Sequence, residues 1–299
     1  MLAVILKSSP MSSLATSINN FISNLENNNN IKNVCLAEKK YIDNKYVTIG
    51  SRKSTYSAYR KFIRNSGLID NIKNETLKIL KLNKDEATAY SNDKIDKVNF
   101  KLEHLKVITD VEGYIETGIS LIKKPSYVDK ILGFCCVTGR RPAEIGCSSD
   151  FCFVDINHLE FTGQLKTKSP ELKSYVIPCL MNTSDFLRYW QDFREQHTKN
   201  VIDKKDHSLN DFYSTELTKK FHSSYAKDMS MRVKKYFKQF LGDDVTTYNL
   251  RHTYATIATM KFNNMSKNLY HDDKFRAKIL GHNERDLVSV DTYKQFLKI

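Results

Sequence analysis

The 299-residue sequence lacks several features that would assign it to common classes of protein. No apolar run approaches the ~18–20 residues that a membrane-spanning helix needs. The apolar start, MLAVILKSSP, has no basic segment before it, so we do not expect a signal peptide. Six cysteines are scattered without a CxxC pair, and four lie in or beside apolar runs. This pattern indicates reduced, buried thiols in an intracellular protein rather than disulfides or a zinc site.

Acidic residues are also scarce relative to basic ones. The chain has 47 Lys and Arg against 34 Asp and Glu, which gives a formal net charge of +13 and a pI near 9.3. A protein this basic usually binds polyanions, most often nucleic acid, although solvating lysines alone would give the same composition. The length allows one large domain or two smaller ones.

The first hundred residues predict a small helical domain. Apolar residues recur at helical spacing in residues 12–26, and residues 51–67 predict a second helix, capped by Ser54 and Thr55. Its inward side chains would be Tyr56, Tyr59, Phe62 and Ile63, and its outward cations Arg52, Lys53, Arg60, Lys61 and Arg64. Such a helix suits the DNA backbone, but an ordinary solvated helix face would have the same sequence. Residues 84–99 are polar and weakly periodic, and we place an interdomain linker there.

The sequence therefore divides into residues 1–97, a helical DNA-binding domain with its linker, and residues 98–299. The second part alternates helical patterns with three short β-type runs, FCFVDI, LEFTGQLK and KSYVIP. Gly139 suits the end of a helix that follows Ser126. Further helices are expected at about 215–222, 226–241, 248–262, 273–280 and 291–298. The predicted fold class is mainly α with a small three-stranded antiparallel sheet (α+β).

Five short phrases in this second part contain residues suited to phosphodiester chemistry. They are TGRRPAE at 138–144, GQLK at 163–166, YNLR at 248–251, LGH at 280–282 and TY at 292–293. Transesterification of a phosphodiester needs a nucleophile, positive charge on the non-bridging oxygens and a proton donor for the leaving 5′-oxygen.

Arginine suits the stabilisation of the non-bridging oxygens, because its guanidinium group binds two phosphate oxygens at once and stays charged. Arg141 and Arg251 are therefore the candidates to bind the pentacoordinate phosphorane that forms during transesterification, one from each side. Glu144 follows Arg141 by one helical turn, so it could orient that guanidinium or simply pair with an arginine. We expect the neighbouring Arg140 to contact the DNA backbone or to lie exposed.

The remaining tasks fall to lysine, histidine and tyrosine. Lys166, at a strand end before a turn, is the candidate general acid, with Lys168 as the alternative and otherwise a DNA contact. Tyr248 shares a helix face with Arg251 and can donate a hydrogen bond to the phosphate, but it could also be a core aromatic. His282 follows Gly281, which ends a helix, and its imidazole can face a phosphate oxygen. Tyr293, eleven residues later, is the candidate nucleophile.

Together, the five phrases resemble the active site of the tyrosine recombinase and type IB topoisomerase superfamily. Tyr248 stands where most of that superfamily has His, and this is similar to the telomere resolvases, or protelomerases. The resemblance implies a tyrosine recombinase-like catalytic domain at 98–299, preceded by a core-binding-like domain. It also implies cleavage through a 3′-phosphotyrosyl intermediate, without metal or nucleotide cofactor, and hairpin products.

The implied partner is double-stranded DNA with a palindromic site, bound by a homodimer or higher oligomer. The implied location is with that DNA in a prokaryotic cell, or the chain is encoded by a virus or plasmid. Two alternatives stay open: a compact recombinase that exchanges strands between duplexes, and a catalytically silent DNA-binding relative. A hydrolytic nuclease is less favoured, because no carboxylate cluster for metals accompanies the motifs.

Overall fold

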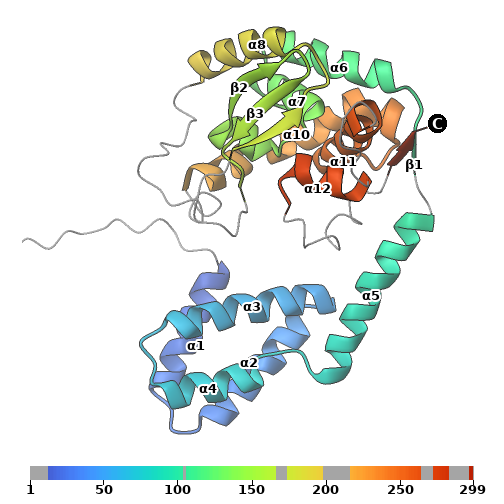
Figure 1. The fold of residues 1–299 in the computed structure, drawn as a ribbon. Helices are drawn as coiled ribbons and strands as arrows, with labels where there is room; N and C mark the ends of the chain where they lie inside the picture. The colour runs from blue at the N-terminus through green and yellow to red at the C-terminus, as the bar shows by residue number, and fades with distance from the viewer. Residues whose placement is uncertain are drawn as a thin grey trace, which may run out of the picture. The chain divides into compact units, whose positions relative to one another are not determined.

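The computed structural model of the chain describes residues 13–103, 106–165, 174–197, 216–263, 272–282 and 296–298. The chain divides into two compact units, Met1–Lys97 and Val98–Ile299 (Figure 1). Each unit has its own hydrophobic core. In the described ranges, no helix combines the length and the apolar character that crossing a membrane requires.

The first unit is helical. It comprises α1 (Ser13–Glu26), α2 (Ile31–Lys45), α3 (Ile49–Asn65), α4 (Asp70–Ile79) and most of α5 (Lys84–Glu103). The helix expected at 12–26 is α1, whereas α2 and α4 were not predicted. Helix α3 begins earlier than expected, because Thr48 rather than Ser54 or Thr55 is its N-cap and accepts a hydrogen bond from the Ser51 N–H at 3.2 Å.

The segment expected to be a linker, residues 84–99, is helical and belongs to α5. Its start is stabilised by a reciprocal pair of hydrogen bonds. The Asn83 side chain accepts from the Glu86 N–H at 2.8 Å, and the Glu86 carboxylate accepts from the Asn83 N–H at 3.0 Å. This is a capping box, a local signal that outweighs the weak apolar periodicity of the helix.

The second unit contains short strands between helices. Its elements begin with β1 (Lys106–Ile108), α6 (Val111–Lys123), α7 (Tyr127–Thr138), η1 (Glu144–Ser148), β2 (Asp150–Asp155), β3 (His158–Thr162), β4 (Tyr175–Pro178) and α8 (Thr183–Gln196). They continue with α10 (Glu216–Leu241), α11 (Thr247–Ala258), η3 (Thr259–Asn263), α12 (Asp272–Leu280) and β5 (Phe296–Lys298).

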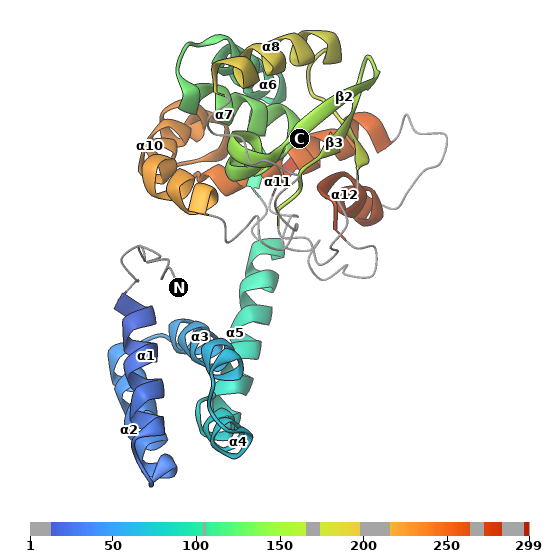
Figure 2. The same ribbon diagram turned by 90° about the vertical axis from the view of Figure 1, so that its left-hand side faces the viewer.

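Helix α7 is the centre of this unit. Every residue from Val128 to Thr138 is buried, and the helix packs against α6, α10 and α11. Figure 2 shows α10 on one side of α7 and the sheet on the other. The sequence YVDKILGFCCVT is apolar apart from Asp129, Lys130 and Thr138, and this explains the position, because a helix with so little polar surface must be covered on nearly every side.

The predicted three-stranded antiparallel sheet is present, in the order β2-β3-β4. Its inner face is apolar, with Phe151 opposite Phe161 and Leu159 opposite Ile177. Trp190 of α8 packs edge-on against Phe151, with ring centroids 4.8 Å apart. The fold class expected from the sequence, mainly helical with this small sheet, is confirmed.

Two other expectations for the C-terminal half are wrong. Residues 216–241 form one helix, α10, instead of two, because no glycine or proline interrupts them and Phe221, Tyr225 and Met229 carry the packed face across the expected break. Residues 296–298 form a strand, β5, which pairs in parallel with β1, instead of the expected helix. Residues 283–295 lie outside the described part of the chain.

Candidate active site

The ends of two helices meet beside the start of a third in the second unit. Helix α7 ends at Thr138, and Gly139 follows in the left-handed conformation, as expected from the sequence. Helix α12 ends at Leu280, followed by Gly281 with φ 67°. The His282 N–H donates to the Ala277 carbonyl at 2.8 Å, and the Gly281 N–H to Lys278 at 3.1 Å. This is a Schellman turn, and it puts His282 directly at the helix end, as predicted.

Arg251 of α11 connects the two helix ends. Its side chain is buried, and its guanidinium donates to the Gly139 carbonyl at 2.6 Å and to the Leu280 carbonyl at 2.8 Å. Carbonyls at helix C-termini lack partners within the helix and carry partial negative charge, so a cation is favourable there. The structure therefore brings together Arg251, the chain leading to Arg141 and the turn that carries His282.

Arg141 is held by Glu144. The Arg141 guanidinium donates to Glu144 Oε1 at 2.6 Å, and its backbone N–H donates to Oε2 at 2.8 Å. Glu144 also accepts from the Leu165 N–H at 3.1 Å, and the Arg141 guanidinium reaches the Leu165 carbonyl at 3.4 Å. Arg141 and Glu144 are thus fixed to the residue that immediately precedes Lys166.

Glu144 is fully buried, and burial alone would raise the pKa of its carboxyl group. The charges of Arg141, Arg251 and Arg140, with the hydrogen bond from the Arg141 backbone, outweigh burial and hold the pKa below its ordinary value. The carboxylate is therefore the counterion of a cluster of three guanidinium groups.

Arg140 differs from the expectation that it contacts DNA or lies exposed. It is only 1% exposed, and its guanidinium donates to the Thr138 carbonyl at 3.1 Å, to the Tyr175 hydroxyl at 2.5 Å and to the Ile279 carbonyl at 2.6 Å. The group also lies 4.7 Å from the centroid of the Phe161 ring. These partners account for its burial.

Tyr248 lies at the start of α11, one turn before Arg251. It is 49% exposed, so the alternative that it is a core aromatic is wrong. Its ring packs edge-on against the buried His252 ring, with centroids 4.5 Å apart. Lys166, Lys168 and Tyr293 lie outside the described residues, so their places in the site stay predictions.

The cations expected on the outer face of α3 separate into two groups. Arg52 pairs with Glu86 at 2.6 Å and approaches Asp43 at 3.7 Å, and Arg60 donates to the Leu77 and Leu80 carbonyls at the end of α4. These two side chains bind within the unit instead of pointing outward, and burial, with a contribution from Arg64, lowers the pKa of Arg60.

The other three cations on α3, Lys53, Lys61 and Arg64, are exposed, as expected. Lys53 lies over the Tyr90 ring, with its ammonium 3.8 Å from the ring centroid. Phe62, expected to point inward, is 40% exposed. Contact of Lys53, Lys61 and Arg64 with DNA stays a prediction.

Helix α10 carries a basic face that was not recognised in the sequence. Exposed residues recur every three or four positions along it, at Lys220, Ser223, Lys227, Ser230, Lys234 and Lys238. They lie opposite the buried Phe221, Met229 and Val233. The signal was available, because lysine and serine alternate at helical spacing, but it requires treating 216–241 as one helix.

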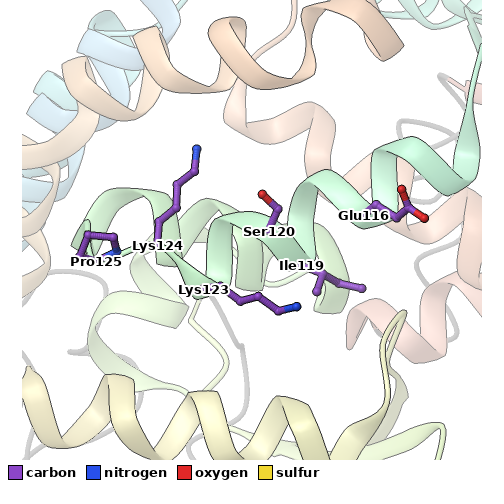
Figure 3. Close-up of a pocket in the computed structure, with 6 residues that line it drawn as sticks. All are labelled: Glu116, Ile119, Ser120, Lys123, Lys124 and Pro125. Carbon is purple, nitrogen blue, oxygen red and sulfur yellow. The ribbon is translucent and has the colours of Figure 1, made fainter.

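A hollow of about 550 Å³ lies elsewhere in the second unit, at the end of α6 (Figure 3). It is lined by Glu116, Ile119, Ser120, Lys123, Lys124 and Pro125. Lys123 and Lys124 point in different directions, and the Lys124 ammonium lies 4.2 Å from the centroid of the Tyr236 ring. None of the candidate catalytic residues that the structure describes lines this hollow.

Comparison with solved structures shows which proteins share this fold. Protelomerase TelA covalently complexed with substrate DNA is 21% identical, with 98% of this chain and 91% of that chain covered and a TM-score of 0.78. A TelA variant complexed with DNA hairpin product is 20% identical over the same shares, also with a TM-score of 0.78. Protelomerase TelK complexed with substrate DNA is 21% identical and covers 96% of this chain and 58% of that chain, with a TM-score of 0.61.

The sequence itself matches a family model. No curated protein matches the chain. Residues 104–296, well over half of the chain, match the family described as the telomere resolvase ResT/TelK catalytic domain. This range includes all five phrases identified in the sequence and the cluster of Arg141, Glu144, Arg251 and His282. The chain therefore belongs to the telomere resolvase family.

Proposed function

We propose that this chain is a telomere resolvase that cuts double-stranded DNA at a palindromic site and seals each end as a hairpin. The single observation that carries the proposal is the cluster that joins Arg141, Arg251 and the His282 turn, within a chain of this family. The protelomerase structures of the same fold, with covalently bound substrate and with hairpin product, support it.

In the proposed reaction, the Tyr293 phenol attacks the scissile phosphorus and the bond to the 5′-oxygen breaks. Lys166 gives a proton to that oxygen, and the DNA is left joined to Tyr293 through its 3′-phosphate. The 5′-hydroxyl of the opposite strand then attacks the phosphotyrosine, its proton passes to the Lys166 amine, and the tyrosinate leaves and takes up a proton from solvent. The number of phosphoester bonds is unchanged, so the cycle needs no energy from a nucleotide.

Charge stabilisation is assigned to the two arginines, with donors on either side. Arg141 and Arg251 would neutralise the phosphorane oxygens, and Glu144 would hold the Arg141 fork in a fixed orientation. Tyr248 and His282 would donate hydrogen bonds to the same oxygens. The half-exposed position of Tyr248 at the start of α11 supports this role, because its ring is accessible to a bound DNA strand.

DNA flanking the cleavage site would contact exposed cations by their phosphates. The exposed lysines of α10 and the α3 cations Lys53, Lys61 and Arg64 are the proposed contacts in the described residues. A palindromic site has twofold symmetry, so we propose that two copies of the chain bind it, each cutting one strand. Such a protein acts where its DNA is, within the cell.

The experiment is covalent capture from a pool of palindromic duplexes that carry 5′-bridging phosphorothiolates. A 5′-thiol leaving group cannot rejoin efficiently and needs no proton, so the adduct should accumulate and should also form with Lys166→Ala. Mass spectrometry should map the adduct to Tyr293, and Tyr293→Phe should form none. An adduct on another tyrosine would refute the assignment.

The captured sequence is then remade with ordinary phosphates and incubated with the wild-type chain. Hairpin products on a denaturing gel are expected. Duplexes with exchanged partners would instead identify a strand-exchanging recombinase. A chain that binds the pool of duplexes but forms no adduct would be a silent relative.

A further inference from the structure

The last carbonyls before His282 are bound by side chains from three separate parts of the chain. The Ile279 carbonyl accepts from Arg140 at 2.6 Å, Leu280 from Arg251 at 2.8 Å, and Gly281 from the Gln164 Nε2 at 2.9 Å. These donors follow α7, lie in α11 and follow β3, respectively. Carbonyls at a helix end lack donors within the helix, so side chains can bind all three without breaking helical hydrogen bonds.

Arg140 and Tyr175 form one side of this arrangement. The Arg140 guanidinium is buried and donates to the Tyr175 hydroxyl at 2.5 Å as well as to Ile279. Tyr175 lies on β4 and packs edge-on against Phe161, with centroids 5.4 Å apart. The sheet therefore fixes the guanidinium that binds the helix end.

Gln164 forms the other side. Gly281 leaves no room between the turn and its neighbours, because a Cβ atom there would lie 2.1 Å from Gln164 Oε1 and 2.4 Å from the Tyr175 hydroxyl. The turn that carries His282 is thus in direct contact with both side chains. Gln164 is also one residue before Leu165, whose N–H donates to Glu144 at 3.1 Å, and two residues before Lys166.

We propose that Gln164, Tyr175 and Arg140 are positioning residues that hold His282 against the scissile phosphate. Gln164 also precedes Leu165, whose N–H binds Glu144, so it lies between the histidine turn and the counterion of the arginine cluster. The inference rests on the proposed function of His282. It adds three residues that act through the main chain of α12 and do not touch the DNA themselves.

The test uses near-isosteric variants and single-turnover cleavage at saturating DNA. Gln164→Met removes the donor to Gly281, and Tyr175→Phe removes the acceptor of Arg140. Loss of one such hydrogen bond should slow cleavage on the order of tenfold and leave DNA affinity unchanged. The matched controls are Gln191→Met, which loses a bond to exposed Glu195, and Tyr127→Phe, which loses a bond to the Gly146 carbonyl. Both controls should cleave at the wild-type rate.

A double-mutant cycle separates positioning from a general structural role. If Gln164 acts through His282, Gln164→Met should have no further effect on the residual cleavage of His282→Ala. An equal fold-loss in both backgrounds, or wild-type cleavage by Gln164→Met and Tyr175→Phe, would overturn the proposal. Wild-type cleavage by His282→Ala would instead refute the role of His282 in the proposed function.

Discussion

Replacement of Glu144 by glutamine removes the counterion of the arginine cluster. The carboxylate is fully buried and accepts from the Arg141 guanidinium at 2.6 Å, the Arg141 N–H at 2.8 Å and the Leu165 N–H at 3.1 Å. Glutamine keeps the size and one acceptor oxygen, but its NH₂ group would face a donor. Three guanidinium groups would then lie together without a buried negative charge.

The magnitude follows from the burial of the pair. Removing one partner of a buried ion pair costs about 3–5 kcal/mol. Arg141 keeps a 17% exposed side chain and can regain part of its hydration, so we expect the lower end, about 3 kcal/mol. For a unit of this size, that lowers the Tm by roughly 6–12 °C. The rate of cleavage should also fall, because Arg141 and Leu165 both lose hydrogen bonds to the Glu144 carboxylate.

The assay is thermal unfolding by circular dichroism, followed by single-turnover cleavage below the lower Tm. The matched control is Glu160→Gln, which removes a carboxylate that binds exposed Ser174 on the open face of the sheet. The control should change the free energy of unfolding by less than about 0.5 kcal/mol. If Glu144→Gln and Glu160→Gln have the same Tm, the carboxylate is not the counterion of the cluster.

Three further outcomes are expected. The folded pKa of Glu144 lies below its ordinary value of 4.5, so its contribution to the free energy of unfolding is present above pH 4.5 and is lost as the pH falls through the folded pKa. The Tm of the wild-type chain should therefore fall more steeply below pH 4.5 than the Tm of Glu144→Gln. Parallel curves of Tm against pH would contradict this. Gly281→Ala should destabilise the chain more than Gly242→Ala, measured by urea unfolding, because both have positive φ but only the first Cβ meets packed atoms. Replacing Lys227 and Lys234 by alanine should lower the salt dependence of DNA binding by about two in the log–log slope, measured by fluorescence anisotropy, and an unchanged slope would remove α10 from the interface.

The features that the sequence predicted depend on local signals. The apolar run of α7 and the following Gly139 define a buried helix and its end, and Gly281 does the same for α12. Glu144 is one turn from Arg141, so their contact is also local. Alternating side chains and turns were enough to find the three-stranded sheet.

Three features that the sequence did not predict depend on distant partners. Arg140 and Arg141 are adjacent, and only the positions of Tyr175 and Ile279 decide that Arg140 is the buried one. A helical-wheel projection of α3 places Arg60 on the outer face, but its guanidinium donates hydrogen bonds to carbonyls at the end of α4. The strand β5 exists because β1, far earlier in the chain, offers its edge.

The acceptors that hold the α12 turn are all main-chain carbonyls, and this has an evolutionary consequence. Ile279 and Leu280 would each present the same oxygen whatever side chain stood there, provided that the backbone conformation is kept, whereas Gly139 and Gly281 have positive φ and no room for a Cβ atom. Substitutions at Ile279 and Leu280 that keep the backbone therefore leave these acceptors unchanged, and the constraint falls on the two glycines and on the donors Arg140, Arg251 and Gln164. Hydrogen bonds to main-chain carbonyls therefore place few demands on the sequence of a fold that this chain shares with a structure only 21% identical to it.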